Sequence, residues 1–283
     1  MNKLVYLSDD EVQSQLATKY NLLVNIGSET FQYAIIDHVN NQVKVLAEFE
    51  FPRISQPGEI VKAIEELPES NRQFKFSFNS IKISFDTSNY TFIPSELYLD
   101  ENREEYGKFL SLTGSSELVV NNLPSSEIKN VVAISSDLNT ALNILFHKPK
   151  IYNQASPFLE GVQKSLKRDD DVVCFIDIQT TRFQVALFKD FKVEFYNSFE
   201  YTNIDEFNYY LLQIIESLNI NIEQTPVTLS GKVNNTDEVY QRLEKYFENI
   251  KFINLEHLII YPDKFEEVQS HAFFTLFSLD LCV

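Results

Sequence analysis

Residues 22–36 read LLVNIGSETFQYAII, and residues 174–188 read CFIDIQTTRFQVALF. The two stretches align without a gap, from residue 22 onto residue 174. The alignment brings together four identical pairs and one Asn with one Asp: Ile26 with Ile178, Phe31 with Phe183, Gln32 with Gln184, Ala34 with Ala186, and Asn25 with Asp177. A shift of about half the 283-residue chain predicts an internal duplication.

Each copy has the same local pattern. An apolar strand meets a short polar turn, and a second strand then alternates apolar and polar residues. A third strand is expected after the turn signals Asn40–Asn41 and Lys189–Asp190. The expected core-facing side chains of the second strands are Phe31, Tyr33 and Ile35 in one copy and Phe183, Val185 and Leu187 in the other.

A helix is predicted after each of these three-strand meanders. Residues 59–67 (EIVKAIEEL) and 206–218 (EFNYYLLQIIESL) carry apolar side chains at helical spacing. Asp205 is the expected N-cap of the second helix, and Asp137 that of a further helix over 138–146. Further strands are expected at 129–134, 227–229 and 251–253, and further helices at 156–166, 237–246 and from about residue 264.

The two copies diverge after the first helix. Residues 74–86 read FKFSFNSIKISFD, a period-2 pattern that predicts a hairpin with its bend at Asn79–Ser80. An acidic helix is expected over 96–112. The predicted domains are therefore residues 1–168, with an inserted strand–helix segment at about 74–112, and residues 169–283. The polar stretch KRDDD at 167–171 joins them.

Composition narrows the possible partners. The formal net charge is −17, and the basic residues form no long run. Nucleic acids and anionic membranes are bound mainly through Lys and Arg, so neither is expected as a partner. No stretch of about 20 apolar residues predicts a membrane span, and the N-terminal residues do not resemble a signal peptide. A cytoplasmic location and a protein partner are expected.

Two copies of a meander followed by a helix, each with an Asn/Asp-Ile-Gly/Gln turn, resemble the actin-like ATPase superfamily of actin, Hsp70 and sugar kinases. Within it, the chain looks most like a small bacterial family of uncharacterised proteins. The type IV pilus actin-like protein and FtsA look like more distant relatives. The resemblance implies an α/β, duplicated actin-like (ribonuclease H-like) fold. Each half would combine a three-strand meander, parallel strands and flanking helices.

The resemblance also implies a nucleotide site, with ATP and Mg²⁺ as cofactors held between the halves. In the superfamily, glycine lets the backbone approach the phosphates, and an aspartate holds Mg²⁺ through water. The implied positions are Asn25, Gly27 and Ser28 in the first turn, Asp177, Thr180 and Thr181 in the second, and Gly231 in the adenosine turn. Asp177 is the implied metal anchor.

Each of these turns departs from the superfamily pattern. Asn25 stands where the first aspartate is expected, and Gln179 replaces the second glycine. Glu29 adds a negative charge to the first turn, and Gly231 stands alone where two glycines are expected. No catalytic residue can be assigned. Plain structural roles compete at these positions: a hairpin glycine with positive φ at residue 27, a solvated or capping carboxylate at Asp177, and a plain strand-to-helix turn at Gly231.

Two functions follow as hypotheses. The first is a non-catalytic or weakly nucleotide-binding actin-like protein that acts as a binding or scaffold module. The alternative is an active ATP-dependent enzyme, an ATPase or kinase, with diverged loops. A protein-binding surface is expected on residues 74–112, with Lys75 and Lys82 on its polar face. The terminal run AFFTLFSLDLCV (272–283) is expected to pack on the sheet of the second half.

Overall fold

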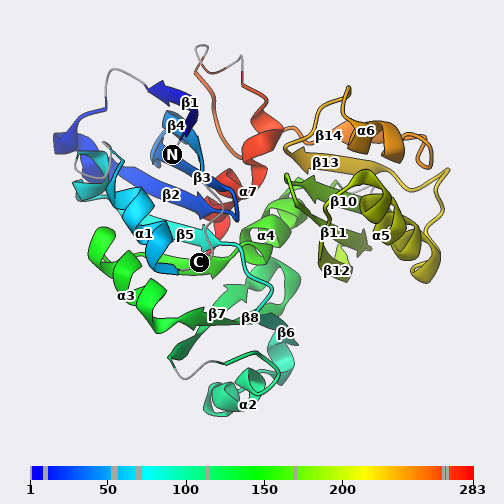
Figure 1. Cartoon of the computed structure of the whole chain (residues 1–283), viewed down its shortest axis with the longest axis horizontal. Coiled ribbons are helices and arrows are strands. Elements are labelled where there is room, and N and C mark those ends of the chain that lie inside the picture. Colours follow the sequence, from blue (N-terminus) through cyan, green and yellow to red (C-terminus); the bar gives the residue numbers. More distant parts are fainter. Residues whose placement is uncertain are drawn as a thin grey trace. The chain divides into compact units, whose positions relative to one another are not determined.

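The computed structural model describes residues 2–8, 12–51, 57–67, 72–112, 115–167, 171–262, 265 and 268–283. Its contacts divide the chain into two compact units (Figure 1). Unit 1 comprises Met1–Gly161, Leu258–Val268 and Thr275–Val283, and unit 2 comprises Val162–His257 and Gln269–Phe274. Most of the predicted joint at 167–171 lies outside the described residues, and the boundary between residues 168 and 169 stays a prediction.

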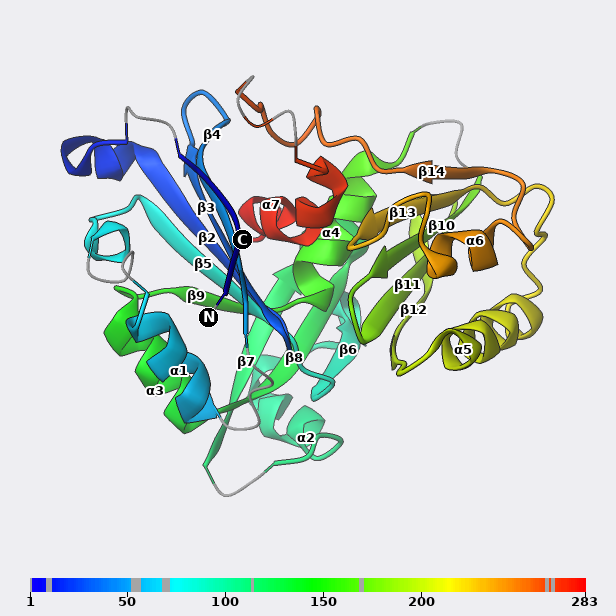
Figure 2. The ribbon, with the colours of Figure 1, turned by 45° about the horizontal axis from the view of Figure 1, so that its top comes forward.

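Unit 1 is built on a six-stranded sheet with the order β1-β4-β3-β2-β5-β9 (Figure 2). Strands β2, β3 and β4 form the predicted antiparallel meander, and β5 and β9 extend it in parallel. The strand bounds are Asn2–Ser8 (β1), Tyr20–Ile26 (β2), Thr30–Asp37 (β3), Gln42–Glu50 (β4), Ser80–Phe85 (β5) and Lys150–Asn153 (β9). A 3-10 turn, Ser14–Lys19, precedes β2.

Unit 2 repeats this arrangement in a five-stranded sheet with the order β12-β11-β10-β13-β14. The strands are Val172–Ile178 (β10), Arg182–Lys189 (β11), Lys192–Glu200 (β12), Val227–Gly231 (β13) and Ile250–Phe252 (β14). The registers also agree, because Asn25 lies opposite Gln32 in unit 1 and Asp177 lies opposite Gln184 in unit 2. Both predicted meanders are therefore confirmed, and their origin by duplication stays a prediction.

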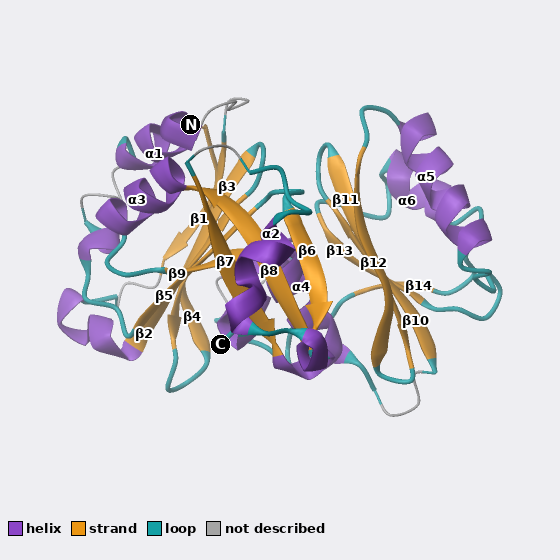
Figure 3. Ribbon diagram, turned by 90° about the horizontal axis from the view of Figure 1, so that it is seen from below, coloured by secondary structure: helices purple, strands orange, loops and turns teal. Residues whose placement is uncertain are grey.

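Helices cover one face of each sheet (Figure 3). They are α1 (Pro57–Glu65) and α3 (Ser136–Leu145) in unit 1, and α5 (Ile204–Ser217) and α6 (Glu238–Leu243) in unit 2. The predicted apolar faces of β3 and β11 are confirmed in the two cores. Buried Phe and Tyr side chains stabilise both cores through their large apolar area. Phe183, for example, packs on Phe207 of α5 with ring centroids 4.7 Å apart.

The predicted hairpin over 74–86 is wrong. Gln73–Lys75 form a 3-10 turn, and β5 is an interior strand between β2 and β9. Phe74 is 2% exposed, and its ring meets Tyr33 edge-on at 4.9 Å. Burial in the unit 1 core therefore outweighs the local period-2 pattern. Lys82 is also buried, so it cannot contribute to the expected polar surface.

A separate three-stranded sheet follows, with the order β6-β8-β7. Its strands are Tyr90–Pro94 (β6), Ser116–Leu123 (β7) and Ile128–Ser135 (β8). The helix expected over 96–112 is largely wrong, because only Arg103–Gly107 (α2) is α-helical. Two 3-10 turns, Ser95–Leu97 and Asp100–Asn102, precede it. Like charges four residues apart, such as Glu101 and Glu105, disfavour one continuous helix.

Two predicted helix caps are wrong by two residues. The Ser135 hydroxyl caps α3 by accepting a bond from the Leu138 amide (3.5 Å). The Asn203 side chain caps α5 by accepting bonds from the amides of Asp205 and Glu206, both at 3.0 Å. In each case the cap is the last extended residue before the helix, as capping geometry requires.

The C-terminal part of the chain returns to unit 1. Helix α4 (Ala155–Ser165) precedes β10, and the chain ends in Ser270–Phe273 (3-10), α7 (Phe274–Ser278) and Leu279–Leu281 (3-10). Residues 272–274 belong to unit 2 and residues 275–283 to unit 1, so the expected packing of the run 272–283 on the sheet of the second half is wrong for residues 275–283. The expected helix start at Lys264 lies outside the described residues. Among the residues described, no helix is long and apolar enough to span a bilayer.

Candidate functional site

A buried polar triad lies near the carboxyl end of β2 in unit 1. Asn25 donates from Nδ2 to Gln32 Oε1 (3.1 Å) and accepts at Oδ1 from Ser84 Oγ (2.8 Å). Gln154 Nε2 also donates to Asn25 Oδ1, at 2.8 Å. The Asn25 side chain is therefore held by three neighbours within its own unit.

The same triad recurs in unit 2, with a carboxylate in place of the amide. Asp177 accepts at Oδ1 from Ser230 Oγ (2.8 Å) and at Oδ2 from Gln184 Nε2 (3.2 Å). Ser84 pairs with Asn25 across the parallel strands, just as Ser230 pairs with Asp177. Both triads lie where open α/β sheets commonly hold ligands, near the carboxyl ends of parallel strands.

The Asp177 carboxylate is enclosed by protein donors. Gln179 Nε2 donates the third hydrogen bond of this carboxylate, to Oδ2 at 2.9 Å. Asp177 is only 2% exposed. Burial raises the pKa of Asp177, while its hydrogen bonds with Gln179, Ser230 and Gln184 oppose that rise. A carboxylate offers about four acceptor positions. With three occupied, little room remains for the water of a hydrated Mg²⁺.

The two turns after β2 and β10 share one backbone geometry. The Gly27 amide donates to the Thr30 carbonyl (2.8 Å), and the Gln179 amide donates to the Arg182 carbonyl (2.7 Å). Gly231 is the one described glycine with positive φ, so a left-handed hairpin conformation at Gly27 is wrong. A Cβ at Gly27 would lie 2.7 Å from Thr30 Oγ1, so a larger residue there would require the Thr30 side chain to shift. The structure places Ser28 and Thr180 on exposed turn tips and Thr181 in a half-buried position.

Gly231 has a backbone role that needs no ligand. Its φ is +87°, and a Cβ there would lie 2.1 Å from the Ile178 carbonyl oxygen. The next amide, that of Lys232, donates to the same carbonyl at 2.6 Å. Only glycine tolerates this approach of β13 to β10.

A pocket of about 320 Å³ lies beside the second turn. Gln179 and Thr180 line it together with Lys232, Asp237 and Glu238. The two carboxylates outnumber the single lysine, so the pocket is electrostatically unfavourable for a polyphosphate. In their present arrangement the residues around Asp177 do not fit a Mg-nucleotide. In the described part of the chain, no three His, Cys, Asp or Glu side chains lie close enough to hold a metal ion.

The sheet orders and helix-covered faces define the class of this protein, the actin-like ATPase fold. A Bacteroides thetaiotaomicron protein with actin-like ATPase fold and unknown function superposes with a TM-score of 0.73 and 19% identity, over 86% of this chain and 96% of that one. The PilM–PilN type IV pilus biogenesis complex superposes with a TM-score of 0.63 and 15% identity, over 92% of this chain and 97% of that one. Ethanolamine utilization protein EutJ from Carboxydothermus hydrogenoformans superposes with a TM-score of 0.53 and 7% identity, over 93% of this chain and 89% of that one. These low identities show the fold alone.

The chain belongs to the family described as "Protein of unknown function (DUF3822)", whose model matches residues 9–250. No curated protein matches the chain. The expectations of an actin-like fold and of a family of uncharacterised proteins are therefore confirmed, and the PilM–PilN complex shares that fold.

Sequence reasoning identified some of the site and missed the rest. It selected Asn25 and Asp177 and noted Gln32 and Gln184 as identical positions, but it did not connect them. Ser84 was missed because it sat in a stretch interpreted as a hairpin. The signal available for it was the parallel between Ser84 and Ser230, each lying near the end of the strand that pairs with the first strand of the meander.

Proposed function

We propose that this protein is a non-catalytic or weakly nucleotide-binding actin-like protein that acts as a protein-binding module. The observation that carries the proposal is the enclosure of Asp177, whose carboxylate accepts three hydrogen bonds from protein donors. A carboxylate held in this way is a poor anchor for hydrated Mg²⁺. Without that cation, the charge that develops in phosphoryl transfer lacks its usual stabilisation.

The test of weak nucleotide binding is calorimetric titration of the full chain with Mg-ATP. We expect no tight isotherm that depends on Mg²⁺, with EDTA and Asp177→Asn as controls. A tight isotherm that EDTA and Asp177→Asn both abolish would contradict the proposal and favour the ATP-dependent enzyme.

The protein-binding part of the proposal rests on the segment between β6 and β7. Four large apolar side chains are exposed there: Leu97, Leu99, Phe109 and Leu112, with Phe109 exposed by 82%. Exposed apolar side chains on an otherwise charged segment are typical of protein interaction sites. The surrounding carboxylates, including Glu96 and Glu101, favour a partner segment with apolar side chains flanked by Lys or Arg. The name of the PilM–PilN complex records a protein partner for one relative of the fold.

The test of this surface is affinity capture with crosslinking, comparing Phe109→Ser with Ile144→Ser. Ile144 on α3 is a matched control because it is also apolar and 77% exposed, on another part of unit 1. We expect Phe109→Ser to weaken recovery of the specific partner about tenfold or more, as for a buried aromatic hot spot. Equal recovery with both variants would remove the segment as the binding surface.

A further inference from the structure

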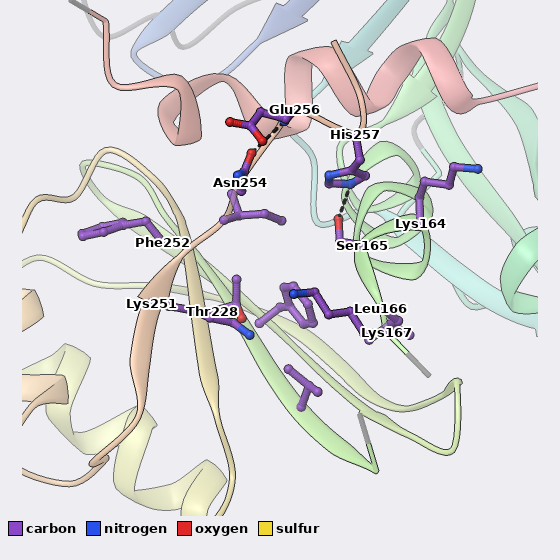
Figure 4. Close-up of a pocket in the computed structure, with 13 residues that line it drawn as sticks. Lys164, Ser165, Leu166, Lys167, Thr228, Lys251, Phe252, Asn254, Glu256 and His257 are labelled. Carbon is purple, nitrogen blue, oxygen red and sulfur yellow. Dashed lines mark hydrogen bonds between the residues drawn. The ribbon is translucent and has the colours of Figure 1, made fainter. Parts of the chain in front are cut away.

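Unit 2 contains a second pocket, of about 570 Å³, which shares no residue with the pocket beside Asp177 (Figure 4). It lies on the face of the sheet opposite α5 and α6, between strands β10, β13 and β14 and the end of α4 with the residues that follow it. Its size suits a small organic molecule. None of the nucleotide-site residues considered above lines it.

One row across the sheet gives this pocket its chemistry. Phe175 of β10 lies beside Thr228 of β13, which lies beside Lys251 of β14. Residues in register on adjacent strands share a face at a spacing of roughly 5 Å. An aromatic ring, a hydroxyl and an ammonium group therefore line one wall of the pocket in that order.

Thr228 is the most informative member of this row. It is 3% exposed, and its Oγ1 has no hydrogen-bond partner among the described residues. A buried hydroxyl without a partner destabilises a fold by about 1–3 kcal/mol. A bound polar group at this point of the pocket would supply the missing partner.

The charges around the pocket favour an anion. Lys164, Lys167 and Lys251 line it against a single acidic residue, Glu256, in a chain with a net charge of −17. Glu256 lies beyond Asn254 as seen from Thr228 (Figure 4). His257 bonds to the Ser165 hydroxyl at 2.9 Å, and partial burial lowers its pKa; a backbone hydrogen bond with Asn254 opposes this, and the charge of Lys164 adds to it. His257 is thus neutral at pH 7, and the lysines carry the positive charge.

We propose that this pocket binds a small organic anion with an aromatic or apolar body. The body packs on Phe175 and Val173, and a phosphate or carboxylate group accepts hydrogen bonds from the Thr228 hydroxyl and the Lys251 ammonium. Lys167 adds positive charge at the rim. The site lies apart from Asp177, so the proposal is independent of the proposed weak nucleotide binding.

The test uses three probes with one aromatic body: 1-naphthyl phosphate, 1-naphthoate and neutral 1-naphthol, titrated into the full chain by fluorescence. We expect the phosphate to bind with a Kd of about 1 mM or tighter. Naphthol should bind at least about tenfold more weakly, because it lacks the charged acceptor. Tighter binding of the phosphate than of the carboxylate would identify a phosphorylated ligand class, and the reverse a carboxylic acid.

Variants assign the binding to this pocket. Thr228→Val keeps the side-chain shape and removes the hydroxyl. It should therefore weaken the binding of naphthyl phosphate about tenfold and leave the affinity for naphthol unchanged. Its melting temperature without ligand should not fall, because the change removes an unpartnered polar group. Lys251→Gln should weaken the phosphate and reduce the salt dependence of binding. The matched control is Lys192→Gln, at an exposed lysine of β12 outside the pocket. It should change neither the affinity for the phosphate nor the salt dependence of binding.

Three results would overturn the proposal. They are no binding of either anion at millimolar concentration, naphthol binding as tightly as the phosphate, and equal affinity in wild type, Thr228→Val and Lys251→Gln.

Discussion

At the scale of single residues, Asn25 and Asp177 occupy equivalent positions of the two units, one with an amide and the other with a carboxylate. Both lie in the same triad with a glutamine and a serine, and both are almost fully buried. The amide of Asn25 both donates and accepts, whereas the carboxylate of Asp177 only accepts. A buried carboxylate costs more desolvation free energy than a buried amide. The unit 2 triad therefore carries a cost that the unit 1 triad avoids.

Asp177→Asn tests that cost. Because burial raises the folded-state pKa of Asp177 above its unfolded value, ionisation disfavours the fold as pH rises through the folded pKa. We expect the variant to be more stable than wild type at pH 7, by about 1.4 kcal/mol per unit of raised pKa. The advantage should vanish as pH falls toward 4.

Chemical unfolding between pH 4 and pH 8 measures this difference. Asp190→Asn, the same substitution at an exposed turn of the same unit, is the matched control. If Asp177→Asn instead loses stability at pH 7, the ionised carboxylate stabilises the fold, and the assigned direction is wrong.

At the scale of elements, buried amides join the three-stranded sheet to the main sheet of unit 1. Asn121 of β7 donates from Nδ2 to the Ile151 carbonyl of β9 (2.9 Å). Its Oδ1 accepts from the Asn153 amide (3.0 Å) and from Ser156 Oγ (3.1 Å). These bonds fix the position of β7 against β9 and the start of α4.

Asn121→Leu should destabilise unit 1 by about 3 kcal/mol, because it leaves buried donors and an acceptor of β9 and α4 unpaired. Thermal unfolding and hydrogen exchange at β7 and β9 measure the effect. Asn122→Leu, the next residue of the same strand on the opposite face, is the control and should change stability by less than about 0.5 kcal/mol. Equal losses in both variants would show that β7 tolerates no leucine and that the amide bonds are not responsible.

At the scale of the whole molecule, the chain leaves unit 1, forms most of unit 2, and closes unit 1 with its last residues. Lys82 of β5 secures that closure. Its buried ammonium donates to the carbonyls of Asp280 (2.6 Å) and Cys282 (2.7 Å), and it lies 3.8 Å from the Asp280 carboxylate. Burial lowers the pKa of Lys82, and the charge of Asp280 opposes this.

Lys82→Met should release the C-terminal turn, since two carbonyls lose their donor, at a cost of about 2 kcal/mol or more. Cys282 is buried and free, so its rate of alkylation reports the release. We expect alkylation of Cys282 to accelerate while that of Cys174 in unit 2 stays slow. Lys150→Met, at an exposed lysine of β9, is the control. An unchanged rate at Cys282 would show that apolar packing alone holds the C-terminus.

The two meanders could be predicted from the residues alone, because alternating apolar residues around turn signals such as Asn40–Asn41 form sheets from local interactions. The alignment of residues 22–36 with 174–188 also carried the resemblance from which the class of fold was expected. The partners of β5, the β6-β8-β7 sheet and the return of residues 275–283 to unit 1 emerged only from the three-dimensional structure. These depend on contacts between distant residues, such as Phe74 with Tyr33 and Lys82 with Asp280, which local patterns do not encode. The triads and the pocket at Thr228 follow the same rule, because parallel pairing brings Ser84, Ser230 and Lys251 beside their partners.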